Sequence, residues 1–383
     1  MARRTKNESA RDFRPGPIGW ARRRVLPLLA KGSALLGIVL LGAWITGRVL
    51  TDEHHWSQYL YWLPPLGVVG GAWVLLVLST IFAALGVWHL QRVVTVSDAK
   101  APDAIRVLHW NHGGKTIDTD AWGARIKEID TDIVLIANPD WGEERQDLLE
   151  QFEYFAPDER VRWVNYSYRV HADPAHFRVE GHAVIASRFA MTRTGKVYFG
   201  DHERTQVMNH SSSGNGWVMF AQFDLDPERI DDEPMVVWFV DLPSNPMVWK
   251  AEEMRTVRRA IDSWDGSGWE MGRHVWERYE DPGAVFPTPD LVVGDFNTPR
   301  GSASLDLIAP GYRDAFEAAG HGRGRSFVIR DGSTAERAVF GLVDLHIDLT
   351  LVAPQHRVSR YRLLPTQNTD HSAQIADIVL GNE

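Results

Sequence analysis

The chain of 383 residues contains no cysteine, so a disulfide framework and a thiolate metal site are both excluded, and the redox state of its compartment is left open. Outside the N-terminus, acidic residues outnumber basic ones. Residues 1–24 hold eight basic and two acidic residues, a net charge of +6, and the whole chain carries −9, which leaves −15 for the remainder. An acidic body disfavours broad, nonspecific binding to nucleic acid, because such binding depends on neutralising many phosphates.

Long hydrophobic runs are confined to the first 90 residues. Residues 26–49 are almost wholly apolar, and residues 59–90 form a second apolar stretch, in which we expect a helix over residues 66–89. Each run is long enough for one helix of about 20 residues across a bilayer. Four aromatic residues at the boundary before the expected helix 66–89 fit the aromatic belt of a membrane interface: Trp56, Tyr59, Tyr61 and Trp62.

These runs divide the chain into a basic cytoplasmic tail (1–25), two transmembrane helices (26–90), a linker (91–102) and a folded domain (103–383). The basic tail predicts a cytoplasmic N-terminus, and two spans joined by the short loop 51–58 then return the domain to the cytoplasmic side. The predicted partner of this region is the membrane lipid bilayer. A cleaved signal peptide is the alternative for the first run, but the second run and the long basic leader argue against it.

Strand and helix patterns interleave through the domain, without internal repeats or low-complexity segments. Apolar and β-branched runs predict strands at residues 105–110, 133–137, 184–187, 206–209, 217–225, 236–241, 291–293, 349–352 and 375–379. Helices are predicted at 120–129 and, from an amphipathic pattern, at 247–264. Many strands and few helices predict a single α/β domain built as a two-sheet sandwich with helices outside.

One short run carries most of the chemical information. The strand Leu291–Val293 ends at Gly294 and is followed by Asp295 and Asn297. Residues two apart in an extended backbone point to the same side, so a carboxylate and a carboxamide face the same space above the strand end. A carboxylate is a hard oxygen ligand for a divalent cation, and an amide donates a hydrogen bond to a phosphate oxygen.

Four further motifs accompany this run in a fixed order. They are Leu108–Asn111 (Leu-His-Trp-Asn), Gly181–Arg188 (Gly-His-Ala-Val-Ile-Ala-Ser-Arg), His346–Val352 (His-Ile-Asp-Leu-Thr-Leu-Val) and Thr369–Ser372 (Thr-Asp-His-Ser). Together with Gly294–Asn297, they resemble the endonuclease/exonuclease/phosphatase (DNase I-like) superfamily over nearly all of residues 103–380. The hydrophobic N-terminus makes the chain similar to a membrane-anchored, bacterial-type member. The resemblance implies a DNase I-like four-layered α/β sandwich.

The resemblance also implies roles for individual residues. Asp295 would orient or deprotonate the attacking water, and Asn297 would hold the phosphate. Asn111 would be an amide close to the metal or to the phosphate, and Asp370 would bind the metal directly or through water. The implied cofactor is Mg²⁺ or Mn²⁺.

An Asp–His pair completes the implied site. His371 would contact the scissile phosphate, and Asp348 would fix its tautomer. A carboxylate on one ring nitrogen orients the other nitrogen toward the reaction centre.

Two positions depart from the family pattern. The second strand of the family ends in a Glu that is the main metal ligand, whereas this chain has Asn138 after Ala137. A neutral amide oxygen binds Mg²⁺ less well than a carboxylate. The family also has a second catalytic His where this chain has Asp241. The site has therefore lost one carboxylate and one imidazole and gained a carboxylate elsewhere.

Two interpretations follow from these departures. In the first, the chain is a membrane-anchored, metal-dependent phosphoester hydrolase with a rearranged site. There, Asp241 supplies the missing charge, Asp140 reaches the metal, and His109 or His112 replaces the lost imidazole. In the second, it is a weak or inactive relative that serves as a membrane-tethered binding module. The acidic body and the anchor favour a lipid head group or a small phosphodiester as the phosphoester substrate over nucleic acid.

Overall fold

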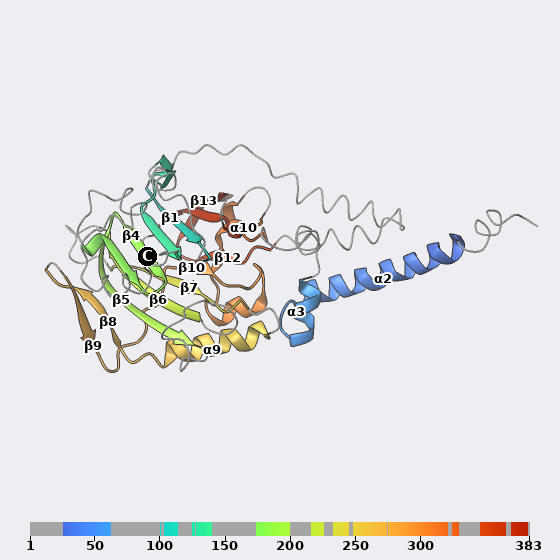
Figure 1. Cartoon of the computed structure of the whole chain (residues 1–383), viewed down its shortest axis with the longest axis horizontal. Helices are drawn as coiled ribbons and strands as arrows, with labels where there is room; N and C mark the ends of the chain where they lie inside the picture. Colours follow the sequence, from blue (N-terminus) through green and yellow to red (C-terminus); the bar gives the residue numbers. More distant parts are fainter. Residues whose placement is uncertain are drawn as a thin grey trace, which may run out of the picture.

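The structure is a computed structural model. It describes residues 26–62, 100, 103–113, 125–126, 128–139, 174–199, 216–225, 233–244, 248–273, 275–320, 324–328, 345–364 and 369–381. Two β-sheets form the body of the domain, and the N-terminal helix α2 projects away from it (Figure 1).

The first sheet has six strands in the order β13-β14-β1-β2-β4-β3. Its strands are β1 (Ala104–Asn111), β2 (Ile133–Ala137), β3 (Phe177–Glu180), β4 (Ala183–Ser187), β13 (Arg357–Leu364) and β14 (Ala373–Val379). β1 pairs in parallel with β2 and antiparallel with β14. The parallel pair brings the carboxyl ends of β1 and β2 to the same edge of the sheet.

The second sheet has eight strands in the order β11-β12-β10-β7-β6-β5-β8-β9. Its strands are β5 (Ala190–Phe199), β6 (Gly216–Asp224), β7 (Met235–Asp241), β8 (Ser267–Met271), β9 (Trp276–Glu280), β10 (Leu291–Asp295), β11 (Arg313–Asp314) and β12 (Asp348–Val352). β10 pairs in parallel with β7 and antiparallel with β12. The carboxyl ends of β7 and β10 therefore meet the amino end of β12.

The main core lies between the two sheets and follows the alternation of side chains along each strand. Ile105 and Val107 of β1 pack there with Val237 of β7 and with Leu291 and Val293 of β10. Side chains at every second position share a face. The same alternation continues to the strand ends. The polar side chains there therefore also point into the space between the sheets.

Helices cover the outer face of the second sheet. The amphipathic helix α9 (Lys250–Asp262) packs Met254, Val257 and Ile261 against the β6–β7–β10 face (Figure 1). The 3-10 helix η5 (Ala303–Leu307) joins the same core through Leu305. The remaining short elements are α10 (Ala315–Ala319) and the 3-10 helix η3 (Pro174–His176).

The predicted two-sheet α/β sandwich is confirmed. The strands expected in Val236–Asp241 and Leu291–Val293 are present as β7 and β10, and the helix expected over 247–264 is α9. The expected strand at 206–209 and most of the expected helix at 120–129 lie outside the described residues. Strand β5 was not predicted, because a β-bulge between Met191 and Arg193 interrupts the period-two pattern of its side chains.

The N-terminal region contains two described helices, α2 (Leu26–Leu50) and α3 (His55–Tyr61). A helix was expected over 26–49, and α2 occupies these residues. No helix in the described part of the chain is long and apolar enough to cross a membrane, so the two predicted transmembrane helices find no support. The second predicted span, 66–89, lies outside the described residues.

The segment between these predicted spans differs from the expected topology. Asp52, Gln58 and Tyr61 are buried against the domain and hydrogen bond to Ser304, Lys250 and Arg300. Residues that hydrogen bond to the domain share its compartment. A loop 51–58 on the side of a membrane opposite to the domain is therefore inconsistent with this packing.

Candidate active site

Three aspartates form a row across neighbouring strands of the second sheet. Asp295, the last residue of β10, is in register with Asp348 at the start of β12 and with Asp241 at the end of β7. All three side chains are almost fully buried. They continue the inward-facing alternation of their strands. Like charges directly opposite each other destabilise a sheet, so this row requires positive charge nearby.

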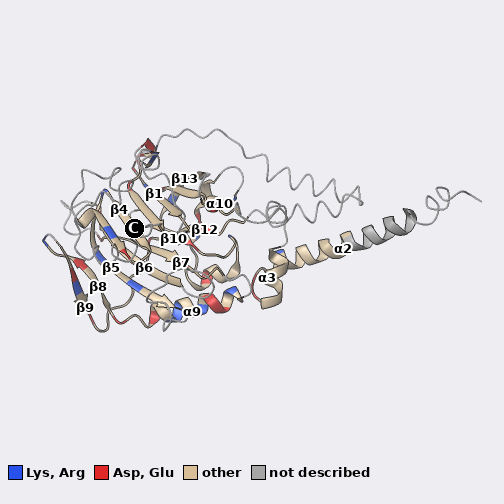
Figure 2. Ribbon diagram, in the orientation of Figure 1, with Lys and Arg blue, Asp and Glu red and all other residues tan. Residues whose placement is uncertain are grey.

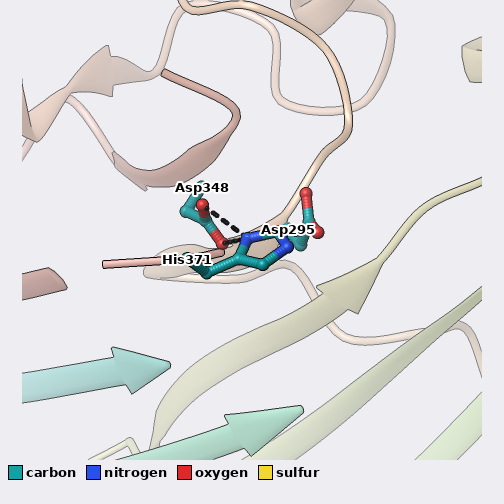
Figure 3. A group of neighbouring side chains, drawn as sticks. All are labelled: Asp295, Asp348 and His371. Carbon is teal, nitrogen blue, oxygen red and sulfur yellow. Dashed lines mark hydrogen bonds and ion pairs between the residues drawn. The ribbon is translucent and has the colours of Figure 1, made fainter. Parts of the chain in front are cut away.

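His371 supplies one such charge and lies between two of the carboxylates (Figure 3). Its Nδ1 lies 3.0 and 3.1 Å from the two carboxylate oxygens of Asp348 and 3.7 Å from Oδ2 of Asp295. Ser326 holds Asp348 in place, because its Oγ accepts hydrogen bonds from the backbone N–H groups of Ile347 and Asp348, both at 3.0 Å. Ser326 was not among the predicted site residues, and no motif in the sequence marks it.

Two amide side chains face the row from the first sheet. Asn111, at the end of β1, donates from Nδ2 to Oδ2 of Asp295 at 2.8 Å. Asn138, just after β2, donates from Nδ2 to Oδ2 of Asp241 at 3.0 Å and to Oδ1 of Asn111 at 3.2 Å. These bonds join the carboxyl ends of strands from both sheets into one network.

The turn after β10 has a backbone that few residues tolerate. Gly294 has a φ of +153°, and a Cβ there would lie 1.9 Å from the carbonyl oxygen of Val240. Asn297 has a φ of +46°, in the left-handed region that Asn enters more readily than most residues. Its backbone N–H donates to Oδ1 of Asp295 at 2.9 Å, and its Nδ2 donates to the carbonyl of Leu242 at 2.7 Å. Asn138 has a similar φ of +48°.

Burial and mutual repulsion change the protonation of the row. Burial, together with the negative charges of Asp348 and Asp241, raises the pKa of Asp295 to about 8. Burial also raises the pKa of Asp241 to about 6, although the hydrogen bond from Asn138 and the charge of His371 oppose the rise. Without a cation, these two carboxyl groups therefore hold protons at pH values where an exposed Asp is ionised.

The Asp–His pair shifts in the opposite sense. Burial lowers the pKa of His371, but the carboxylates of Asp348 and Asp295 outweigh it and raise the pKa to about 9. Burial raises the pKa of Asp348, but the charge and hydrogen bond of His371 outweigh it, and the pKa lies below its usual value. His371 is thus an imidazolium and Asp348 a carboxylate at neutral pH.

Two further predicted metal ligands, Asp370 and Asp140, are not tested by this network. The carboxylate of Asp370 is not part of the described group of Asp295, Asp348 and His371, whose ligand atoms lie within 4.8 Å of one another. The carbonyl of Asp370 instead accepts from the N–H of Val328 at 2.7 Å. Asp140 lies outside the described residues. Metal binding by Asp370 and Asp140 stays a prediction.

His109 and His112, the predicted stand-ins for the missing imidazole, are both buried. Burial lowers the pKa of His109 to about 4 and that of His112 to about 3. Both rings are therefore neutral at physiological pH. The amide Nε2 of Gln374 donates to Nδ1 of His109 at 2.8 Å.

A comparison with family models matches residues 108–371 to the Endonuclease/Exonuclease/phosphatase family. The match covers more than half of the chain and includes every member of the network described above. The chain belongs to this family. The resemblance inferred from the five sequence motifs is thereby confirmed.

Solved structures of similar fold include members of the same family. An endonuclease/exonuclease/phosphatase family protein from Bacteroides thetaiotaomicron is 14% identical, with a TM-score of 0.43 over 73% of this chain and 98% of its own. A functionally unknown conserved protein from Enterococcus faecalis is 15% identical, with a TM-score of 0.46 over 73% and 100%. A mannosyl-6-phosphatase from B. thetaiotaomicron is 15% identical, with a TM-score of 0.43 over 72% and 100%. The comparison with curated proteins gives no match.

The donor set fits a divalent cation of the kind that members of this family use. Once all three aspartates are ionised, they face a single imidazolium, and a cation would offset the excess of negative charge. In addition, Oδ1 of Asp241 is buried and has no hydrogen-bond partner among the described residues. Hard oxygen ligands of this type suit Mg²⁺ or Mn²⁺. The residues that would hold the ion are Asp295 and Asp348, which belong to the group whose ligand atoms lie within 4.8 Å of one another. Asp241 is in register beside Asp295, and the amides of Asn111 and Asn138 bond to Asp295 and Asp241.

Proposed function

We propose that this protein is a metal-dependent phosphoester hydrolase with a rearranged active site. The observation that carries the proposal is the row Asp348–Asp295–Asp241, in register across β12, β10 and β7 and capped by His371. Membership of the family supports the reaction class, because its members include nucleases and phosphatases. Burying a carboxylate is costly, so three aspartates on one buried row favour a functional role.

Asp295 is the residue best placed to orient or deprotonate the attacking water. Asn297 and Asn111 each donate to one of its oxygens at 2.9 and 2.8 Å, so its orientation is fixed before substrate arrives. A carboxyl group with a raised pKa is a stronger base than an exposed one once it is ionised. Asn297 lies beside it and would hold the phosphate.

His371 would act on the opposite side of the reacting phosphorus. As an imidazolium fixed by Asp348, it donates a hydrogen bond to a phosphoryl oxygen or protonates the leaving group. Asp348 holds the ring through Nδ1, and Nε2 is the ring nitrogen that would make this contact. A bound divalent cation would neutralise charge that develops on the phosphoryl oxygens.

Asp241 would compensate for the loss of the Glu that Asn138 replaces. It faces Asn138 across the site, so a carboxylate on the second sheet takes over charge that the family pattern places on the first. The substrate that we propose is a small phosphodiester or a lipid head group, because the body of the chain is acidic. Attachment to a membrane through the N-terminal region is part of this proposal and is supported by the apolar runs 26–49 and 59–90 alone.

Hydrolysis of an aryl phosphodiester by the full chain tests the proposal. The parent protein should turn over with Mg²⁺ or Mn²⁺ and stop in EDTA. Asp295→Ala should lower kcat about 10²–10⁴-fold, the usual contribution of a general base, while the protein stays folded by circular dichroism. Unchanged turnover in Asp295→Ala would remove this residue from the mechanism.

The second candidate is a binding module without turnover, and one observation favours it. The amide nitrogen of Asn138 donates to both Asp241 and Asn111, where a cation would otherwise lie beside these oxygens. A module of this kind would show no metal-dependent turnover in the parent, and activity would appear in Asn138→Glu. Metal-dependent turnover in the parent would exclude it.

A further inference from the structure

Two loops leave the candidate active site and enter helices that lack caps of their own. After Asp241 the chain runs into α9, whose N-cap residue Trp249 makes no side-chain cap hydrogen bond. After Asn297 it runs into η5, whose N-cap residue Ser302 makes none either. The first N–H groups of a helix need an acceptor from outside the helix. In both helices the acceptor comes from residues 51–62, about 190 to 250 positions earlier in the chain.

Gln58 provides the acceptor for α9. Its Oε1 accepts from the N–H of Lys250 at 2.9 Å, and its Nε2 donates to the carbonyl of Val248 at 3.0 Å. The side chain is fully buried. The carboxamide therefore pairs with the backbone on both sides of Trp249, as a neighbouring peptide group would.

Lys250 transmits this contact toward the site. Its buried Nζ donates to the carbonyl of Pro243 at 3.0 Å and to Oε2 of Glu253 at 2.9 Å. Pro243 follows Leu242, whose carbonyl accepts the amide of Asn297. The position of Lys250, and with it the loop after Asp241, thus depends on a residue of α3.

Asp52 provides the acceptor for η5. Its Oδ1 accepts from the N–H of Ser304 at 3.0 Å, and its Oδ2 accepts from Oγ of the same residue. The indole N–H of Trp249 donates to the carbonyl of Asp52 at 3.2 Å, which joins the two capped helices. Asp52 is 1% exposed, whereas its neighbour Glu53 is exposed.

Tyr61 holds the same loop nearer to the site. Its hydroxyl donates to the carbonyl of Arg300. The N–H of Arg300 in turn donates to the carbonyl of His346 at 2.9 Å, two residues before Asp348. Figure 1 shows α3 beside the N-terminal end of α9, where these contacts are made. Figure 2 shows acidic and basic residues along α9, and on this helix Glu252 pairs with Arg255 and Asp262 pairs with Arg258.

We propose that Asp52 and Gln58 are positioning residues of the active site. The segment 51–62 caps α9 and η5 and thereby fixes the loops that follow Asp241 and Asn297. Without the segment, the N-terminal turns of both helices are free to shift, and the two site residues lose their fixed separation. This inference rests on the proposed function only where it predicts a change in turnover. The effect of Asp52 and Gln58 on the loops is measured without substrate.

Hydrogen exchange on the full chain tests the proposal. Asp52→Ala should accelerate amide exchange at residues 302–305, and Gln58→Met should accelerate it at residues 248–252. The expected factor is about fivefold, which is what the loss of one helix cap produces. Exchange in β1 and β2 should stay unchanged. Glu53→Ala is the matched control, because this neighbouring carboxylate is exposed, and it should change none of these rates.

Turnover gives the second readout. In Asp52→Ala, kcat/KM for the aryl phosphodiester should fall about tenfold, because Asp241 and Asn297 lose their fixed separation. Unchanged exchange at both segments in both variants would overturn the proposal, and so would an equal acceleration in β1 and β2. Absence of turnover in the unmutated protein would contradict the proposed function. The exchange rates would still test the positioning role of Asp52 and Gln58.

Discussion

The two sheets contribute opposite kinds of side chain to the candidate site. The second sheet contributes three carboxylates in one row, Asp348, Asp295 and Asp241, whereas the first contributes two neutral amides, Asn111 and Asn138. The acidic half carries charge that needs compensation, and the amide half offers hydrogen bonds without charge. The hydrogen bonds from Asn111 and Asn138 are what connect the halves.

This difference shows how a family site can keep its total charge while moving it. A carboxylate is missing from the end of β2 and present at the end of β7, on the other side of the same space. Asp241 reaches this space because it extends the inward-facing positions of β7 that begin with Met235, Val237 and Phe239. The exchange therefore alters which sheet carries the negative charge and leaves the backbone frame intact.

Breaking the acidic half should produce the largest effect. In Asp348→Asn, His371 loses the carboxylate that contributes most to its raised pKa, so the pKa of the imidazole falls. We expect kcat to fall about 10²–10⁴-fold and the alkaline limb of the pH–rate profile to move to lower pH. Steady-state kinetics between pH 5 and pH 10 measure both changes.

A second Asp–His pair provides the control. Asp290 bonds through Oδ1 to Nε2 of His356 at 2.7 Å, outside the site. Asp290→Asn should cost some stability and leave the pH–rate profile as it is. Equal profiles in the two variants would show that Asp348 acts only through folding.

Returning charge to the amide half should produce a smaller effect of opposite sign. Asn138→Glu places a carboxylate beside Asp241 and removes the amide donor. We expect Mg²⁺ to bind about tenfold more tightly, and we expect the protein in EDTA to lose stability, because an additional carboxylate is buried without a partner. Titration calorimetry gives the affinity, and thermal unfolding with and without Mg²⁺ gives the stability.

Asn138→Gln is the matched variant for this experiment, since it lengthens the side chain equally and adds no charge. Its Mg²⁺ affinity should not rise. An equal gain in Mg²⁺ affinity in both variants would mean that side-chain length causes the effect, and it would contradict the role assigned to charge.

The smallest expected effect is on the pH dependence of stability without metal. The pKa of Asp295 is raised from 3.8 to about 8, that of Asp241 from 3.8 to about 6, and that of His371 from 6.5 to about 9. In each case the folded state binds more protons than the unfolded state between the two values, so stability falls as the pH rises through that window. The lowered pKa of Asp348 acts only at acid pH, outside this range.

The Tm of the EDTA-treated protein should therefore decrease from pH 6 to pH 9. Each kcal/mol lost corresponds to about 2–4 °C for a domain of this size class. Mg²⁺ should flatten the curve, because a bound cation replaces the protons, and Asp295→Asn should flatten it partly. A Tm that rises over this range would mean that the row is ionised in the folded state without a cation.

Local patterns were sufficient for much of the fold. The run Leu291–Asn297 predicts a buried strand with two polar side chains on one side, and β10 has this form because its neighbours on both sides are also buried strands. The bulged strand β5 and the hairpin of β8 and β9 were not predictable in this way. Their exposed positions carry polar residues without strict alternation. They are held as strands by pairing, β5 with β6 and β8, and β8 with β9.

The sequence marked polar residues at the strand ends but did not show how they are arranged. In the sequence, Asp241 stands at the end of an apolar strand, at a position where the family pattern has His. Only the structure shows that Asp241 lies beside Asp295, through the register of β7 with β10, and that it contacts Asn138 of the first sheet. Ser326 lies in a stretch without any motif. It contacts the backbone of Asp348 because residues 324–328 pack beside the amino end of β12.

The sequence by itself determined the family, the strand ends that carry polar groups and the chemical types available there, since these depend on neighbours in the chain. Tertiary structure decided which of these groups meet, how burial shifts their pKa values, and that residues 51–62 belong with the domain. Asp52 and Gln58 stand in a segment that composition alone assigns to a membrane boundary. Their hydrogen bonds to Ser304 and Lys250 reach across about 250 and 190 positions, and contacts over such separations leave no periodic trace in a single sequence.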